Sequence, residues 1–221
     1  MHFHLPKPLH GWRELAGEVG IIDIGVLIAL GAEQVVESVH WRESVSQMRQ
    51  AMHSELGIDR KRLEVNLAQD SCMNARLDAI LRWDSTAPAS ARITNADGPV
   101  LWNYHTSTWD ITKTSPTAGH LSLGEQLKYA ETYDAIANEQ RYLFAEQGSW
   151  TDLAATLASA DRPEERARIE RDVASARLHL AGRDANGRSL LLRLDQLGVK
   201  ADAAGVPVRV DVHRLCRPLE G

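Results

Sequence analysis

The chain has 221 residues, a formal net charge of −5 at pH 7 and a sequence pI near 6.0. This length suits one well-packed domain with an additional segment, and it is too short for two ordinary domains. Lys and Arg are spread singly among Asp and Glu, which argues against the concentrated basic surface that nucleic-acid binding requires. The chain has only two cysteines, so a zinc cluster and a dense disulfide scaffold are both excluded.

An apolar segment near the N-terminus decides where the chain is expected to reside. Between Glu18 and Glu33, 14 residues are all apolar or glycine except Asp23. Extended to residues 15–36, the segment would form about 33 Å of helix, enough to cross a hydrocarbon core of about 30 Å. We therefore expect a transmembrane helix at 15–36. The alternative is a glycine-rich helix in the core of a soluble protein.

The energy of inserting this segment into a bilayer is nearly balanced. Eight Ile, Leu and Val residues between Val19 and Leu30 contribute roughly −2.4 to −4.8 kcal/mol in total. Asp23, near the centre of the helix, costs roughly +2.5 to +3.5 kcal/mol. Trp12 and Trp41 favour insertion, because they lie 29 residues apart, about 43 Å along a helix, and indole rings prefer the two membrane interfaces.

Small residues and the single acid predict contact with another helix. The pairs Ala16/Gly20 and Gly25/Ala29 have the small-xxx-small spacing that is common where membrane helices touch. Because Asp23 leaves an isolated helix with little margin, we expect a polar or cationic partner, or a second copy of the helix, to cover it. The expected partners are therefore membrane lipid and either an integral membrane protein or a homo-oligomer.

The stretch FHLPKPLHGWRELAGEVGIIDIGVLIALGAEQVVE resembles the N-terminus of a group of largely uncharacterised bacterial single-pass membrane proteins. Their signature is a short basic tail, a Gly-Glu pair, an apolar IGVLIAL-type core and a polar exit. The matching positions are Gly17, Glu18, Ile24 to Leu30, Glu33 and Gln34, within about the first 45 residues. The resemblance implies a cytoplasmic N-terminus and a domain outside the inner membrane, with no known activity. The chain departs from the group at Asp23, where such proteins are usually apolar.

Charge alone does not orient the segment, since Lys7 and Arg13 precede it and Arg42 and Arg49 follow it. The orientation rests instead on the resemblance and on the cysteines. The expected organisation is a cytoplasmic tail at 1–14, a transmembrane helix at 15–36 in the bacterial inner membrane, and a periplasmic helical domain at 37–221.

The rest of the chain predicts a mainly α-helical, up-and-down bundle. Helical periodicity continues beyond the anchor, with a kink expected near Gly57. Ser122 and Glu125 have the capping-box pattern at the start of a strongly helical stretch. In a later helix, Gly182 and the pair Asn186-Gly187 are expected to interrupt the pattern.

Two segments are less regular. Residues 101–114, LWNYHTSTWDITKT, also suit a strand, but we favour a short helix that packs Trp102, Tyr104 and Trp109 into the core. Alternating valines at 206–212 predict an extended C-terminal tail or a single strand.

Cys72 and Cys216 are expected to form a disulfide if the domain is periplasmic. Cys72 lies on a predicted helix near its apolar face, so the bridge would pin the tail to the membrane-proximal helix. The alternative is two unrelated buried thiols. No His or basic cluster lies nearby in the sequence to lower the pKa of the Cys72 thiol, so we do not expect a catalytic cysteine.

No constellation predicts catalysis, a metal site or a cofactor. The nine histidines form neither an HExxH motif nor a clustered ligand set. Asp110 and Asp134 have no spacing typical of paired general acids and bases. Ser107 and Ser149 lack a nucleophile-elbow context, and the phosphate-binding glycine motifs are missing.

We therefore expect a non-enzymatic, membrane-anchored scaffold or an accessory subunit of an inner-membrane complex. An alternative is a periplasmic small-molecule sensing domain that signals through a partner, because aromatic residues could line a pocket between helices. These residues are Trp102, Tyr104, Trp109, Tyr129, Tyr133, Tyr142 and Trp150. Ordinary core packing is the simpler expectation for them.

Overall fold

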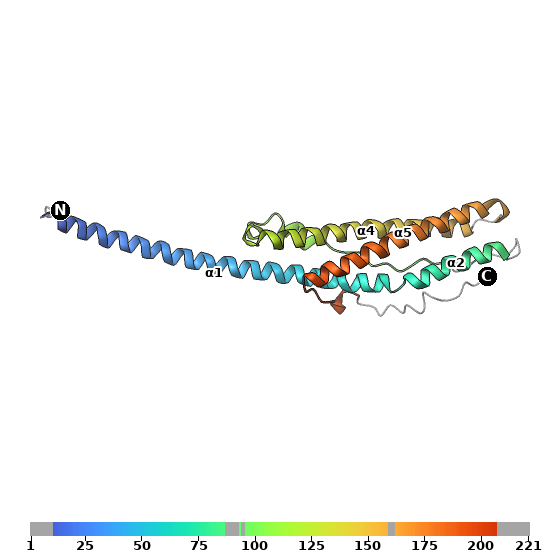
Figure 1. The fold of residues 1–221 in the computed structure, drawn as a ribbon, viewed down its shortest axis with the longest axis horizontal. Coiled ribbons are helices and arrows are strands. Elements are labelled where there is room, and N and C mark those ends of the chain that lie inside the picture. Colours follow the sequence, from blue (N-terminus) through green and yellow to red (C-terminus); the bar gives the residue numbers. More distant parts are fainter. Residues whose placement is uncertain (1–10, 87–92, 94–95, 159–161, 207–221) are drawn as a thin grey trace, which may run out of the picture. The chain divides into compact units, whose positions relative to one another are not determined.

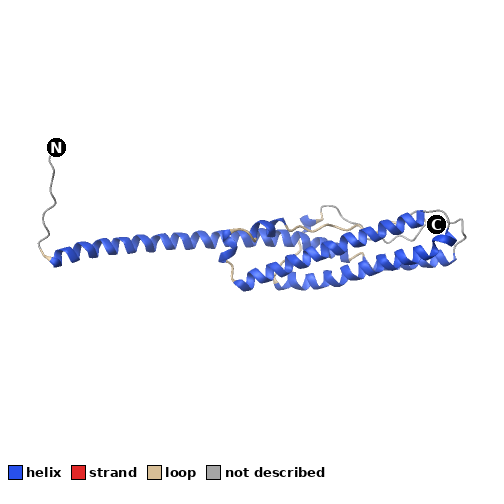
Figure 2. Cartoon of the chain, turned by 90° about the horizontal axis from the view of Figure 1, so that it is seen from above, coloured by secondary structure: helices blue, strands red, loops and turns tan. Residues whose placement is uncertain are grey.

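The computed structural model describes residues 11–86, 93, 96–158 and 162–206. The chain divides into two compact units, Met1–Gln47 and Met48–Gly221. The described residues contain no strand (Figure 2), which confirms the mainly α-helical fold. The elements in chain order are α1 (Trp12–Leu67), α2 (Asp70–Thr86), α3 (Ser107–Thr112), the 3-10 helix η1 (Pro116–His120), α4 (Leu123–Ala158), α5 (Arg162–Gln196) and the 3-10 helix η2 (Ala203–Gly205).

In the first unit, the described residues form an uninterrupted helical stretch, the N-terminal part of α1. The helix begins at Trp12, directly after Gly11, whose φ of 113° lies in the region that favours glycine. No residue within 12–47 breaks the helix, so Gly17, Gly20 and Gly25 are all tolerated inside it.

In the second unit, α2, α4 and α5 are the long packed helices (Figure 1). α4 and α5 form an antiparallel pair, and α5 also contacts α2. Their facing apolar side chains are removed from water, which is the main favourable contribution to folding. This core contains Met73, Leu77, Ile80, Ile93, Trp150, Leu153, Leu157, Ile169, Val173, Ala176 and Leu180.

The start of α4 confirms the predicted capping box. The Ser122 hydroxyl accepts from the Glu125 backbone N–H at 3.3 Å, and the Glu125 carboxylate accepts from the Ser122 backbone N–H at 3.4 Å. The carboxylate also binds Arg49 of α1 at 3.0 Å, so the same acid caps one helix and ties it to another.

The predicted interruptions at Gly182 and Asn186-Gly187 were wrong, because α5 continues through these residues. At Gly57, where a kink was expected, α1 also continues without a break. Each glycine instead allows close packing. An added Cβ would lie 2.9 Å from the Lys200 carbonyl oxygen at Gly57, and 2.7 Å from the Tyr142 ring at Gly182. At Gly187 it would lie 3.0–3.1 Å from side chains of α1 and α4. Packing therefore overrides the low helix propensity of glycine.

The helix favoured for residues 101–114 forms only in part. Residues 101–106 are not helical, and α3 begins at Ser107. Trp102 and Tyr104 therefore belong to a non-helical segment, whose backbone binds polar side chains. The valine-rich tail predicted at 206–212 lies outside the described residues, except for Val206.

Candidate membrane anchor and buried polar network

The segment predicted to cross a membrane lies on α1, within the first unit. Among the described residues, one helix has the length and composition of a membrane span, and its most apolar 18-residue window has a mean hydropathy of 1.9 with no residue buried. Ile21, Ile22 and Ile24 are 74%, 64% and 59% exposed. Because successive helical residues are about 100° apart, these side chains point in different directions around the helix.

The predicted helix-packing residues lie on this surface. Asp23, Gly25 and Ala29 are exposed and Gly20 is half-exposed. A Cβ added at Gly20 or Gly25 would meet no atom within 4 Å, so no described part of this chain requires a glycine there. Contact of these residues with another helix stays a prediction.

The two tryptophans predicted to mark the membrane interfaces differ in their surroundings. Trp12 is 78% exposed at the first residue of α1. Trp41 is half-buried, and its indole N–H donates to the Glu37 carboxylate at 3.2 Å. Its ring also meets the His40 ring edge-on, with centroids 5.4 Å apart. Both rings thus have the amphipathic character that suits an interface.

Cys72 lies on α2, half-buried against the apolar core of the second unit. It is not a free thiol in the structure. Cys216 lies outside the described residues, so the pairing of Cys72 with Cys216 stays a prediction.

Polar side chains along α1 and in the turn after it hold the non-helical segment 100–106 in place. The polar ladder consists of Glu55, Asp59, Asn66 and Gln69, at or directly after the C-terminal part of the helix. All four are buried, at 8%, 1%, 0% and 0% exposure. Glu55, Asp59 and Asn66 are four and seven residues apart, which places them along one face of α1, and Gln69 follows in the turn after the helix.

The two amides of the ladder bind backbone atoms in pairs. Gln69 accepts from the Val100 N–H at 2.9 Å and donates to the Val100 carbonyl at 2.8 Å. Asn66 does the same with Trp102, at 2.8 and 3.0 Å. Each amide thereby satisfies both polar groups of one peptide residue, as a neighbouring β-strand would. These bonds explain why this segment is not helical.

The two carboxylates of the ladder complete the path of the segment. Asp59 accepts from the His105 backbone N–H at 3.0 and 3.1 Å. Glu55 accepts from the Ser107 hydroxyl at 2.8 Å and the Thr108 N–H at 2.9 Å, at the first residues of α3. The Tyr133 hydroxyl of α4 donates to the other oxygen of Glu55 at 3.0 Å. Burial raises the pKa of Asp59 to about 7, against the lowering effect of the His105 N–H.

A second polar group lies between the long helices of this unit. This ionic cluster consists of Asp70 on α2, Glu139 and Glu146 on α4, and Arg183 on α5. The fully buried Arg183 guanidinium donates to both Asp70 and Glu146. Glu139 accepts instead from the Asn186 amide at 2.7 Å. The cluster therefore joins all three helices through charge-assisted hydrogen bonds.

The charges in the ionic cluster do not balance, since one guanidinium faces three carboxyl groups. Burial raises the pKa of Asp70 and of Glu139 to about 7 and also raises the pKa of Glu146, although the Arg183 charge lowers all three. Burial alone would lower the pKa of Arg183, but the charges of Glu146 and Asp70 outweigh it and raise that pKa. The cluster therefore binds protons near neutral pH while Arg183 stays charged.

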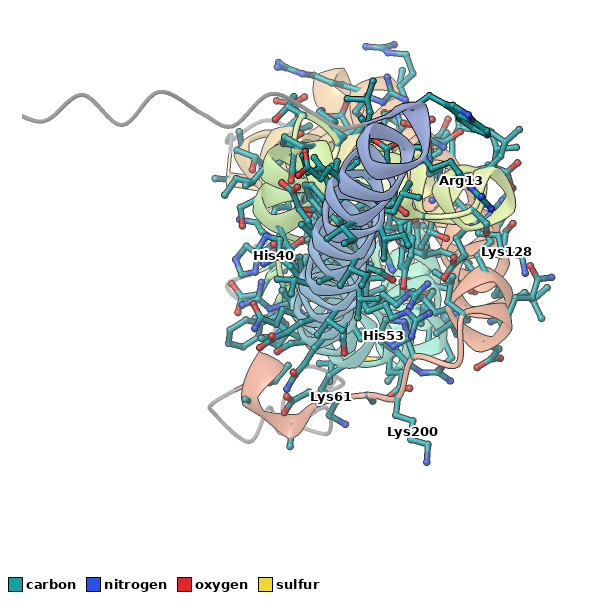
Figure 3. The ribbon with its side chains drawn as sticks, turned by 90° about the vertical axis from the view of Figure 1, so that its left-hand side faces the viewer. Arg13, His40, His53, Lys61, Lys128 and Lys200 are labelled. Atoms are coloured by element: carbon teal, nitrogen blue, oxygen red, sulfur yellow. The ribbon has the colours of Figure 1, made fainter. Side chains whose placement is uncertain are left out.

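Most of the aromatic side chains considered as pocket lining are core residues. Tyr104, Tyr129, Tyr133 and Trp150 are buried, and Trp109 stacks on Tyr133 with ring centroids 5.3 Å apart. The Tyr129 hydroxyl lies 3.0 Å from His53, which Figure 3 labels. One hollow of about 420 Å³ is lined in part by Tyr104, together with Asn103, Thr106, Ile136, Ala137, Gln140 and Phe144.

Three of the four residues considered for acid–base or nucleophilic chemistry, Ser107, Asp110 and Ser149, are engaged in contacts within the chain, and Asp134 is exposed. Asp110 accepts from Lys113 at 2.6 Å, which lowers the pKa of this exposed acid. Ser149 is buried and lies 2.6 Å from His179 Nδ1, while its hydroxyl is also 3.1 Å from the Ala145 carbonyl oxygen. Ser149 lies within α4, and its contact with His179 joins α4 to α5.

The sequence analysis did not predict the polar ladder or the ionic cluster, although the sequence contains a pattern that indicates the ladder. Glu55, Asp59 and Asn66 recur along α1 at steps that apolar core residues normally use. The burial of Arg183 is harder to predict from the sequence, because a charged residue in a helix is usually exposed. Its position between Gly182 and Gly187, which allow close helix contacts, is the local sign of its burial.

Comparison of the chain with protein-family models, with curated proteins and with solved structures returned no match.

Proposed function

We propose that the chain is a non-enzymatic, single-pass protein of the bacterial inner membrane. Residues 15–36 cross the membrane, residues 1–14 lie in the cytoplasm, and residues 37–221 form a periplasmic helical domain. This domain acts as a scaffold or accessory subunit of a membrane complex. The observation that supports the proposal is the exposed apolar surface of α1 in the first unit.

The distribution of that surface favours lipid as its cover. Fully burying one Ile, Leu or Val side chain contributes about 1.5–3 kcal/mol, so a long exposed apolar run is costly in water. A helix that packs on one soluble partner needs only a single apolar stripe, whereas an apolar surface on all sides is typical of a membrane span. Ile21, Ile22 and Ile24 show the second pattern.

The second unit supports a role in interaction. It has its own apolar core and buried polar network, so its helices are held together within this unit. Several large apolar side chains on its surface remain exposed and are available to a partner. They are Ile111, Leu123, Leu127, Phe144, Leu178 and Leu192.

Carbonate extraction of bacterial membranes tests the anchor. The wild-type chain should stay in the membrane pellet. Ile24→Asp should shift it to the soluble fraction, because a second acid costs roughly +2.5 to +3.5 kcal/mol of a nearly balanced insertion energy. Ile111→Asp is the matched control, since Ile111 is equally apolar and 73% exposed but lies in the second unit. A wild-type chain that is fully soluble contradicts the proposal.

Orientation is tested separately. A reporter enzyme that is active only in the periplasm, fused after Gly221, should be active, and the same reporter fused before the anchor should not. The reverse result would place the helical domain in the cytoplasm.

One observation favours a second function, a small-molecule sensing domain. The hollow of about 420 Å³ beside Tyr104 has an apolar wall of Ile136 and Phe144 and polar groups from Asn103 and Gln140. This size and lining suit a small ligand. Mass spectrometry of the chain purified in mild detergent distinguishes the functions: a bound small molecule that is lost in Phe144→Ala supports sensing, and a stoichiometric membrane protein supports the scaffold.

A further inference from the structure

Several of the small and polar residues in the candidate span, Asp23 among them, lie along one line of α1. We define the Asp23 seam as Ala16, Gly20, Asp23, Leu27, Leu30 and Gln34. Their steps of four and three residues repeat as in helices that pack in pairs, and they place all six along one line of the helix. Ile21, Ile28, Ala32, Val35 and Val39 lie away from this line, together with Glu18, Gly25 and Ala29.

No described residue covers the seam. Asp23 is exposed, Leu27 is 67% exposed and Leu30 is 51% exposed. A Cβ at Gly20 would meet open space, so the small residue beside Asp23 leaves room for a neighbouring backbone.

The charges along the helix decide what kind of neighbour fits. The chain has no Lys or Arg between Arg13 and Arg42. In a parallel, symmetric pair of identical helices, each residue faces the same residue of the other copy, so Asp23 would meet Asp23. Two carboxylates in a bilayer repel each other, whereas a cation compensates a single carboxylate.

We propose that the Asp23 seam binds a transmembrane helix of a different integral membrane protein, which carries a Lys or Arg at the depth of Asp23. This inference rests on the proposed function and names the chemistry of the partner. Ile28, which lies outside the seam, then faces lipid.

Photo-crosslinking in native membranes tests which side is covered. A photoreactive amino acid at Leu27 probes the seam, and one at Ile28 is a matched control, since both side chains are 67% exposed and only Leu27 belongs to the seam. We expect a crosslinked product from position 27 that contains an integral membrane protein with a Lys or Arg in its span. Position 28 should give at least about tenfold less product. A product containing two copies of this chain, or equal products from both positions, overturns the proposal.

Substitutions of Asp23 test the charge. With equal amounts of chain in the membrane, Asp23→Asn should reduce the yield of the crosslinked partner about tenfold or more, because a buried cation is left unpaired. Asp23→Glu keeps the charge and should retain most of the yield. Exchanging the charges, with Asp23→Lys and an acid in place of the partner's cation, should restore it. Undiminished yield with Asp23→Asn overturns the cationic partner.

The two proposals fail differently. A chain that carbonate extracts from the membrane refutes the anchor and this inference together. A chain that stays in the membrane but gives no product from position 27 refutes this inference alone.

Discussion

Arg183 places a fully buried guanidinium between carboxylates from two other helices. An apolar side chain of similar length would fill the same space, but it would leave Asp70 and Glu146 without their cation. Removing one partner of a buried ion pair is costly because the desolvation of the remaining charges is no longer offset. Arg183 is therefore required by its surroundings as well as by packing.

For Arg183→Met, we expect the free energy of unfolding at pH 8 to fall by about 3–5 kcal/mol, measured by urea denaturation of the full chain in detergent. Arg188→Met is the control. Arg188 lies on the same helix and pairs with Asp184 on the surface, so its loss should have no measurable effect. An equal loss of stability from both substitutions would contradict the prediction that the ionic cluster stabilises the fold more than a surface ion pair does.

Glu139 gives a prediction that depends on pH. Its pKa rises from 4.5 to about 7 in the folded chain, so the folded state binds more protons between these values and the free energy of unfolding falls as pH rises through this window. Asp59 and Asp70 shift in the same direction. Glu139→Gln removes one of these groups and keeps an oxygen that accepts from Asn186.

We therefore expect Glu139→Gln to raise the free energy of unfolding at pH 8 by on the order of 1 kcal/mol, with no gain near pH 4. Glu131→Gln, an exposed acid on the same helix, should leave the pH dependence unchanged. The measurement is urea denaturation at several pH values. A pH dependence that is the same in wild type and Glu139→Gln would contradict the raised pKa.

At the scale of the helices, α4 and α5 approach closely enough that Gly182 lies under the Tyr142 ring. A methyl group there must push the ring or the helix aside, and overpacking of this kind usually costs about 1–3 kcal/mol. Gly182→Ala should therefore lower the free energy of unfolding. Gly148→Ala on α4 should raise it by up to about 1 kcal/mol, because nothing lies within 4 Å and alanine favours the helix. Thermal melts of the two variants should shift in opposite directions.

The helical fold could be predicted from the sequence, because the apolar residues of α2, α4 and α5 repeat at helical steps and Ser122 with Glu125 marks a helix start. The glycines misled that prediction. Local propensity treats Gly182 and Gly187 as breaks, whereas only the packed structure shows the atoms that would clash with a side chain.

The buried polar network could not be predicted from local patterns. The bonds of Asn66 to Trp102 and of Arg183 to Asp70 join residues that are far apart in the sequence. The apolar segment of α1 shows the opposite case. Its length, apolarity and single acid are properties of one continuous segment, so they could be read from the sequence, while its insertion into a membrane and a partner for Asp23 stay predictions.

At the scale of the whole molecule, the chain joins a unit with an exposed apolar surface to a unit with its own core. If the second unit lies in the periplasm, a bridge between Cys72 and Cys216 would connect its first helices to the C-terminal residues. Closing such a long loop restricts the unfolded chain.

We expect Cys72→Ser, Cys216→Ser and the double substitution to lower the free energy of unfolding by the same amount, about 2–5 kcal/mol. Equal losses are expected because either single change already removes the bridge. Thiol labelling of the native membranes should modify neither cysteine in the wild type before reduction. Additive losses in the double variant, or two thiols labelled without reductant, would contradict the bridge.

The polar ladder on α1 has a consequence for how this chain can change over time. Gln69 binds the main chain of Val100, and Asn66 binds the main chain of Trp102. Every amino acid except proline supplies these main-chain groups in the same form. Side chains at positions 100 and 102 can therefore vary while the segment keeps its course along the helix. A proline at either position, or the loss of the Asn66 or Gln69 amide, would release it.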